Sequence, residues 1–499
     1  MERYDDKSSV ALLPVTERTV SFEGTAEISL PEYLGEVGRL LWVRPTLQFP
    51  NGFLSAGTAE YAGRVTYRVL FVGTDGRLYG TEQEENYSFS LPCEATGLDR
   101  VSVVPQIDAV ISRVLGPRKL SVRCRMRAEV MGYAEKSLAP DLGHVEGELC
   151  RMGDVTDGGR FSLLQGDAVE LGEEIAIEGE SPVQAVFAHA EVYMPDVTAR
   201  AGEVHCRGEA VVTLLLSPEA GAPYAVVRRL PFDVAIAGEA VTTGAAARAH
   251  ATACDLRVIP GEGCVALALS FLPVAEVQEN EPIAYLKDAF VVGMQTTCQS
   301  ERVRIFRAGE CGNVHFSVSG TAESEACGLP REAVILASLA EAEVRDKHCD
   351  SRGTTVAGEI CCHILYKNGE EFGATGMSVP FSVRTEGEFE ALSVKATVPT
   401  CRVGRQGSLL SLDAELMLAL RASNSAELTR VSEIEVAPRA RHRNADVEIC
   451  YPARGETVWS VARRYAVSPE ELAISNGIAG DSEGRSDGAS YLLIPPFEG

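Results

Sequence analysis

Apolar and polar residues alternate with a period of two along much of this chain. Counting from Gly63, Gly208 and Gly358, the second, fourth, sixth and eighth following residues are apolar in every case, while the positions between them are mixed. A period of two brings the apolar side chains to one face of an extended strand. The segments that follow these three glycines are therefore predicted to be half-buried β-strands.

The three predicted strands belong to one longer pattern that recurs along the chain. The glycines are 145 and 150 residues apart, and an aromatic residue follows each after 23 or 24 residues, at Tyr87, Phe232 and Phe381. Turn residues such as those at 73–76 separate the strand from the aromatic residue, which favours a hairpin. Each copy then ends in a further alternating strand, most clearly at residues 410–420. This self-similarity predicts tandem repeats of one domain.

The patterning defines a fold class and four predicted domains. Long amphipathic helices are scarce before residue 446. We therefore predict a mainly β protein, in which tandem antiparallel β-sandwich or open-barrel repeats precede a small α+β domain of βααβ order. The predicted domains are residues 15–150, 155–283 (the divergent second repeat), 286–437 and 446–497.

The first helix of the C-terminal domain is predicted from its cap and its apolar stripe. The hydroxyl of Thr457 is placed to accept from free backbone amides of a first turn. Val458, Val461, Ala462 and Tyr465 then follow at helical spacing on one face, and Trp459 lies beside that stripe.

A second helix follows directly. Ser468, Pro469 and Glu471 form a predicted capping box with proline at the first helical position. Asn476 and Gly477 supply a left-handed exit. Strands before residue 452 and at residues 492–494 complete the domain.

Acidic residues outnumber basic ones, and this excludes some partners. The 71 Asp and Glu residues against 46 Lys and Arg residues give a formal net charge of −25 over 499 residues. Such a surface repels phosphate backbones, so we expect no nucleic-acid partner. The N-terminal sequence lacks the cationic start and apolar core of a secretory signal, and no apolar run reaches membrane-spanning length. We expect a chain that stays inside the cell and has no transmembrane segment.

Cysteine and histidine residues form no recognisable catalytic or metal motif. The 14 cysteines include no Cys-x-x-Cys pair, and Cys361 and Cys362 would point to opposite faces of a strand. Reduced thiols are expected inside a cell. We predict no catalytic residue, no metal site and no cofactor. The stripe of Arg123, Arg125 and Arg127 is interpreted as an exposed strand face, with docking of an acidic partner as the alternative.

Two parts of the chain each resemble a known protein family. Residues 455–465, 467–472, 476–478 and 492–495 resemble a LysM module. The glycine strands, together with the Pro-Phe-Ser segment at 380–382, the segment at 114–120 and the connector at 285–290, resemble the SPOCS domain of clostridial spore-coat morphogenetic proteins. That second resemblance covers most of residues 18–435.

The LysM resemblance implies a shallow groove that binds glycans containing N-acetylglucosamine. The implied groove residues are Gly455, Glu456, Thr457, Val458, Asn476, Gly477 and Ile478. The family has a leucine and a glycine before its last strand, where this chain has Ser486 and Ala489. This departure leaves room for a protein ligand in place of a sugar.

The SPOCS resemblance implies a place and a partner. Proteins of this kind act in the cytoplasm of the mother cell, at the forespore surface, and bind the basement-layer ATPase of the spore coat or another coat protein. We therefore predict a non-enzymatic adaptor in spore-coat assembly that docks through its LysM-like domain. The alternatives are a binder of peptidoglycan or chitin-type glycan, for which export would be the discriminator, and a LysM-targeted cell-wall hydrolase, which would cleave peptidoglycan.

Overall fold

The structure is a computed structural model, and most of the chain that it describes is β-strand. It describes residues 10–48, 50–55, 58–92, 100–143, 145–177, 183–219, 221–261, 263–350, 353–386, 389–438, 448–478 and 491–495. Within these ranges the strands pair in antiparallel sheets, and the two helices both lie after residue 457. The prediction of a mainly β protein is confirmed.

The first unit, residues 10–137, holds two sheets around one apolar core. Its strands are β1 (Val10–Ser29), β2 (Val37–Leu47), β3 (Asn51–Ser55), β4 (Thr58–Gly73), β5 (Leu78–Pro92), β6 (Arg100–Gly116) and β7 (Lys119–Ser137). In one sheet β7 lies between β1 and β6, and in the other β4 pairs with β2, β3 and β5. Tyr67 of β4 and Met126 of β7 are both fully buried in the shared core.

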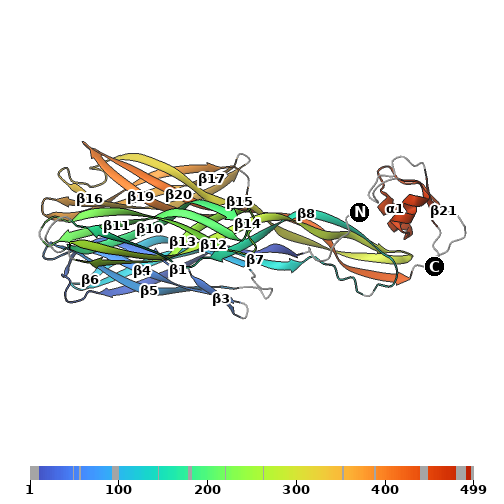
Figure 1. The fold of residues 1–499 in the computed structure, drawn as a ribbon, viewed down its shortest axis with the longest axis horizontal. Coiled ribbons are helices and arrows are strands. Elements are labelled where there is room, and N and C mark those ends of the chain that lie inside the picture. Colours follow the sequence, from blue (N-terminus) through green and yellow to red (C-terminus); the bar gives the residue numbers. More distant parts are fainter. Residues whose placement is uncertain are drawn as a thin grey trace.

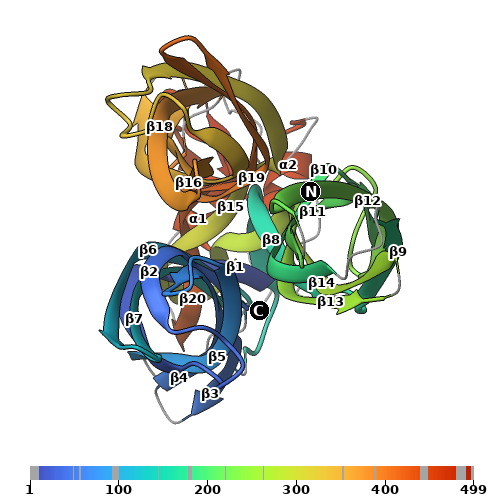
Figure 2. The same cartoon turned by 90° about the vertical axis from the view of Figure 1, so that its left-hand side faces the viewer.

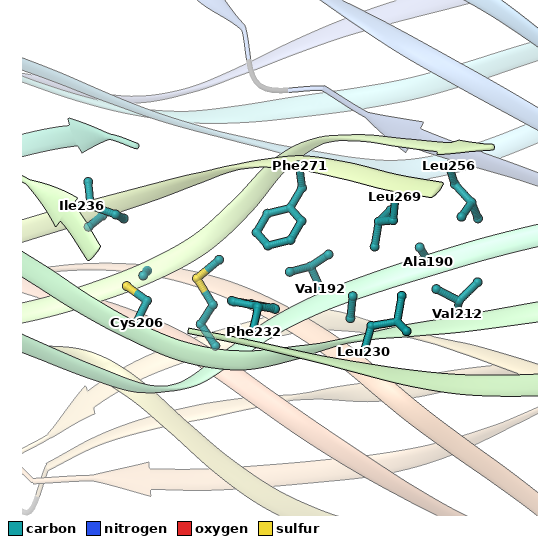
Figure 3. Close-up of a cluster of buried hydrophobic side chains, with 14 of the residues drawn as sticks. Ala190, Val192, Cys206, Val212, Leu230, Phe232, Ile236, Leu256, Leu269 and Phe271 are labelled. Atoms are coloured by element: carbon teal, nitrogen blue, oxygen red, sulfur yellow. The ribbon is translucent and has the colours of Figure 1, made fainter. Parts of the chain in front are cut away.

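The second unit, residues 149–291, has a corresponding pair of sheets. Its strands are β8 (Leu149–Gln165), β9 (Val169–Ala176), β10 (Val183–Arg200), β11 (Glu203–Pro218), β12 (Tyr224–Ala237), β13 (Ala246–Pro260) and β14 (Cys264–Val291). β11 lies between β10 and β12, and β14 pairs with β8, β9 and β13. Figure 3 shows side chains of both sheets, such as Phe232 and Phe271, meeting in the core.

The third unit, residues 294–438, has the same strand order. Its strands are β15 (Met294–Glu323), β16 (Val334–Asp350), β17 (Gly353–Asn368), β18 (Glu371–Thr385), β19 (Ala391–Gln406) and β20 (Leu409–Pro438). β20 lies between β15 and β19, and β17 lies between β16 and β18. In each unit, therefore, the final strand lies between the first and the penultimate strand of the unit.

The glycines and aromatic residues of the sequence pattern face each other across neighbouring strands. The directly opposed pairs are Gly63–Tyr87, Gly208–Phe232 and Gly358–Phe381. The ring covers the glycine, as cross-strand aromatic residues do where a strand glycine has no side chain of its own. A Cβ at Gly208 or Gly358 would also lie 2.1 Å from a backbone oxygen of the neighbouring strand. These two positions therefore require glycine for close backbone approach.

The three units pack around a common axis and contact one another in a ring. Figure 2 views the molecule along its length, with one unit at each corner of a triangle. β5 of the first unit contacts β10 of the second, β12 contacts β16 of the third, and β18 contacts β2 of the first. Strands at equivalent positions of the units thus form these three contacts.

An apolar cluster joins all three units at one end of the molecule. It includes Trp42 and Leu70 of the first unit, Phe187 of the second, and Leu339 and Leu365 of the third. The Trp42 and Phe187 rings meet edge to face with centroids 5.5 Å apart, a favourable geometry for aromatic pairs. Burial of this cluster contributes to holding the units as one block.

A buried ion network also connects the three units. Glu276 of the second unit pairs with Arg248 at 2.7 Å and with Arg421 of the third unit at 2.9 Å, and it accepts from Ser102 Oγ of the first unit at 3.1 Å. Burial would raise the pKa of Glu276, but Arg248 and Arg421 outweigh it and hold that pKa at about 2. The carboxylate therefore stays charged and connects all three units.

Long strands of the second and third units continue beyond the block as a stalk (Figure 1). It is built from parts of β8, β14, β15 and β20. β8 pairs with β14 over residues 149–165 and 274–291, and in the stretch that forms the stalk and its base β15 pairs with β20 over residues 294–308 and 423–438. Leu286, Ala289, Val431 and Ile434 form an apolar cluster inside it. The stalk ends at the turn between β14 and β15, at residues 292–293.

A small module follows at the end of the stalk. Its elements are β21 (Glu448–Cys450), α1 (Val458–Tyr465), α2 (Pro469–Ser475) and β22 (Leu492–Ile494), with β21 and β22 antiparallel. Figure 1 places this module at the far end of the molecule from the three-unit cluster. The strand–helix–helix–strand order is as expected from the sequence, while membership of the LysM family stays a prediction.

Candidate binding module at the end of the stalk

Helix α1 begins with a reciprocal cap. The Thr457 hydroxyl accepts from the Ser460 backbone N–H at 3.2 Å, and the Ser460 hydroxyl accepts from the Thr457 N–H at 3.1 Å. These bonds satisfy two amides that a helix start leaves free. The predicted stripe is buried at Val458, Val461 and Ala462, which face the core of the module.

The cap of α2 differs from the prediction. Ser468 occupies the N-cap position and Pro469 the first helical position, but the Ser468 side chain makes no capping hydrogen bond. The predicted capping box with Glu471 is therefore wrong. Ser468 is buried whereas Glu471 is exposed, so the two side chains lie in different surroundings and do not bond reciprocally. Gly477 does adopt the predicted left-handed conformation, with φ of 64°.

The implied groove residues fall into two groups in the structure. Gly455 and Gly477 are exposed, both with positive φ, and a Cβ at either would meet no atom within 4 Å. Val458 is fully buried, and Ile478 packs against the same apolar cluster. The two loops thus converge on one core, and their glycines leave backbone open to solvent.

Three other implied groove residues bond within the module. Glu456 pairs with Arg464 at 2.8 Å, and its carboxylate accepts from the Ala453 N–H at 2.8 Å. Asn476 donates to the Leu493 carbonyl at 2.8 Å and accepts from the Leu493 N–H at 2.6 Å. With Thr457 in its cap, these side chains hold the loops in place. Ser486 and Ala489, where the chain departs from the LysM pattern, lie outside the described residues.

The module docks on the tip of the stalk through α1. The Trp459 ring meets Phe290 edge to face with centroids 5.1 Å apart, and both residues are buried. Trp459 Nε1 donates to Asp288 Oδ2 at 2.8 Å, and Arg463 pairs with the same carboxylate. We call this contact the docking interface.

Backbone and apolar contacts extend the docking interface. The Gly293 N–H, in the turn at the tip, donates to the Ala466 carbonyl at the end of α1, at 2.8 Å. Cys150 of β8 joins the apolar cluster of the module, and burial raises the pKa of its thiol to about 12. The thiol is therefore neutral at physiological pH and acts as an apolar side chain.

Sequence reasoning missed the docking interface, although both sides carried a signal. Trp459 stands outside the α1 stripe, and a large aromatic residue beside a buried stripe indicates a second contact surface. Asp288 and Phe290 lie within the connector at 285–290, which was singled out only for its family resemblance. Nothing in the sequence indicated that these two segments meet.

Large apolar residues are exposed on several elements of the module. Ile449 and Leu493 are opposed on β21 and β22 and are 47% and 39% exposed. Tyr451 and Tyr491 flank them and are also exposed, as is Ile474 of α2 at 79%. We call these five residues the exposed apolar residues of the module. Exposed apolar side chains on a small module offer contact area to a protein partner.

Other candidate chemistry is used internally or is not found in the described ranges. Arg123 pairs with Glu23 and Arg127 with Asp108, so the predicted arginine stripe is partly neutralised within its own sheet. Among the described residues, no group of three or more His, Cys, Asp or Glu is placed to hold a metal ion. Neither described helix has the length and apolar content that crossing a membrane requires.

Comparison with known proteins identifies no relative. No protein-family model, no curated protein and no solved structure matches this chain.

Proposed function

We propose that this chain is a non-enzymatic adaptor in spore-coat assembly, in which three SPOCS-type repeats carry a LysM-like module. The single observation that carries the proposal is the position of that module. It is held at the end of a stalk, far from the three-unit block, by Trp459, Asp288 and Phe290. A rigid stalk that presents a small binding unit suits a protein that connects two macromolecules. The recurring strand order and the glycine–aromatic pairs support the repeat assignment.

The partner that fits best is a protein of the coat, such as its basement-layer ATPase, bound at the forespore surface in the mother-cell cytoplasm. Of the implied groove residues, Glu456, Thr457 and Asn476 already bond within the module. Their polar groups are therefore largely engaged before any sugar arrives. The exposed apolar residues of the module instead offer apolar and aromatic side chains, which proteins use as anchors in their interfaces. Contacts by the β units with the same assembly would add avidity.

Glycan binding is the second candidate, because one feature favours it. The exposed glycine positions Gly455 and Gly477 leave backbone accessible on the loops that the LysM resemblance assigns to the groove. A pyranose ring could approach that backbone closely, since no side chain stands in the way.

Binding measurements with surface variants separate the two candidates. The full chain is titrated with the purified coat ATPase, with N-acetylglucosamine oligomers and with peptidoglycan. We expect Tyr451→Ser and Ile474→Ser to weaken ATPase binding at least tenfold without lowering the melting temperature. Tyr33→Ser is the matched control, because Tyr33 is 81% exposed on the first unit, away from the module. Tight binding of the oligomers alone would favour the glycan candidate, and cleavage of peptidoglycan would refute a non-enzymatic role.

A further inference from the structure

Two cysteines of the third unit face each other across its core. Cys362 lies on β17 and Cys401 on β19, in different sheets of that unit. Their sulfur atoms are 3.3 Å apart, within contact distance for an S–H···S hydrogen bond. Cys362 is only 2% exposed and belongs to the apolar core of the unit, against which Cys401 packs. The pair is thus held in register by both sheets.

The neighbouring cysteine supplies an internal contrast. Cys361 precedes Cys362 on β17 and points to the opposite face of the sheet, where Ser378 Oγ lies 3.7 Å from its sulfur. It is therefore turned away from Cys401 and from the core. Of these two cysteines, only Cys362 is placed to react with the sulfur of Cys401.

One member of the pair lies in the wall of a cavity. Cys401 lines a cavity of about 470 Å³ between the second and third units. The lining includes the apolar residues Leu336 and Val398 and the buried His189 of the second unit. A cavity of this volume admits molecules far larger than water. A small oxidant can therefore come close to Cys401, whereas Cys362 is not among the residues that line the cavity.

We propose that Cys362 and Cys401 are an oxidisable pair that forms a disulfide when the protein meets a peroxide. The Cys401 thiol gives up its proton, and the thiolate attacks one oxygen of hydrogen peroxide. The O–O bond breaks, the leaving hydroxide takes up that proton as water, and Cys401 becomes a sulfenic acid. The Cys362 sulfur then attacks the sulfenic sulfur, the S–O bond breaks, and a second water carries away the Cys362 proton. Two thiols are oxidised by two electrons and one peroxide is reduced to two waters.

The hydrogen bond within the pair favours this order of events. The hydrogen bond between the two sulfurs lowers the pKa of Cys401 and raises that of Cys362. The Cys401 sulfur is thereby the better nucleophile, and the Cys362 sulfur resolves the sulfenic acid. Ser338 Oγ of β16 donates to the Cys401 carbonyl at 3.0 Å and so fixes β19 beside the second sheet. The sulfurs need to move by only about 1 Å to reach bonding distance.

The disulfide would tie the two sheets of the third unit to each other. It would close a loop that contains all of β18, and it would restrict the unfolded chain. The oxidised protein should therefore melt at a higher temperature than the reduced protein. Because the sulfurs already lie inside the core, the native fold should change little.

Peptide mapping of the full chain tests the proposal. Reduced protein is treated with a slight excess of hydrogen peroxide, free thiols are alkylated, and the protein is digested with trypsin without reductant. We expect residues 353–367 linked to residues 396–402, with a mass lower by two hydrogen atoms than the sum of the two peptides. The Cys361→Ser variant is the matched control and should form the same link, which assigns the bond to Cys362.

Two further variants distinguish oxidation of the pair from general thiol damage. Cys362→Ser should yield no link and should leave a Cys401 sulfenic acid that dimedone traps. Cys401→Ser should yield neither product and should lose the rise in melting temperature that wild type and Cys361→Ser show on oxidation. Alkylated Cys362 and Cys401 after peroxide treatment of the wild type, or a link that survives in Cys362→Ser, would overturn the proposal.

Discussion

Replacing Asp288 by alanine should release the module from the stalk without unfolding either part. Asp288 belongs to β14, yet its carboxylate accepts from Trp459 Nε1 at 2.8 Å and pairs with Arg463 of α1. The variant leaves both donors of the module without their partner. It removes no side chain from the apolar core of the module, so the fold of the module itself should persist.

The magnitude follows from the burial of each contact. Trp459 is 4% exposed, so its hydrogen bond to a carboxylate should contribute about 1.5–3 kcal/mol. The Arg463 side chain is 37% exposed, and solvent screening limits its pair with Asp288 to about 0.5 kcal/mol. We therefore expect docking to weaken by about 2–3.5 kcal/mol, which corresponds to about 30- to 300-fold in the docking equilibrium.

Hydrogen exchange at a single amide measures this change directly. The Gly293 N–H donates across the docking interface to the Ala466 carbonyl, so its exchange requires the module to leave the stalk. In Asp288→Ala its exchange should accelerate by the same factor. The matched control is Asp154→Ala, since Asp154 pairs with Lys287 on the stalk surface and its side chain is 41% exposed. Unchanged Gly293 exchange in Asp288→Ala, or equal acceleration in both variants, would refute this account of docking.

Three further predictions concern the buried ion network, the strand glycines and the helix caps. Glu276→Gln should destabilise the chain by about 3–5 kcal/mol in urea unfolding, because it leaves two buried arginines without their counter-charge. In the wild type the folded pKa of Glu276 is about 2, against an ordinary 4.5. The stabilisation by the charged carboxylate is therefore present above pH 4.5 and is lost as the pH falls towards 2. Acid unfolding at a higher pH in the wild type than in the variant would contradict this prediction. Gly208→Ala should cost about 1–3 kcal/mol through its close backbone contact, whereas Gly312→Ala in β15 meets no atom within 4 Å and should leave the melting temperature nearly unchanged. Thr457→Ala should cost about 0.5–2 kcal/mol and speed amide exchange at the start of α1, while Ser468→Ala should not speed exchange at the start of α2, since no side-chain cap is present there.

The strands could be predicted from the sequence because burial of one face of a sheet produces apolar residues at every second position. Val65 and Tyr67, at the first two apolar positions after Gly63, are fully buried in the first unit. Helix α1 could be predicted in the same way, because burial of one helix face produces an apolar stripe at helical spacing. Burial patterns within one element need no knowledge of partners, so sequence alone is enough to find them.

Contacts between distant segments could not be predicted in this way. Glu276 reaches Ser102 and Arg421, which lie more than a hundred residues away on either side. In the sequence it is an ordinary acidic residue in an alternating strand. Trp459 likewise finds Asp288 across 171 residues. The absent Ser468 cap shows a different limit of sequence-based prediction. The local capping motif is present, but the buried Ser468 side chain makes no hydrogen bond to the amides of α2.

The cyclic contacts among the three units restrict how this architecture could grow. Each unit offers one joining surface to the next and receives another from the previous one, from β5 and β10 through to β18 and β2. Because these head-to-tail contacts close into a ring, no unit keeps an unoccupied joining surface. Copies of the chain should therefore not polymerise through these surfaces. The closed ring also fixes the number of units at three, because a fourth unit gained by gene duplication would fit only if an existing contact between units opened. Longer stalk strands, by contrast, would extend the reach of the module and leave the ring intact.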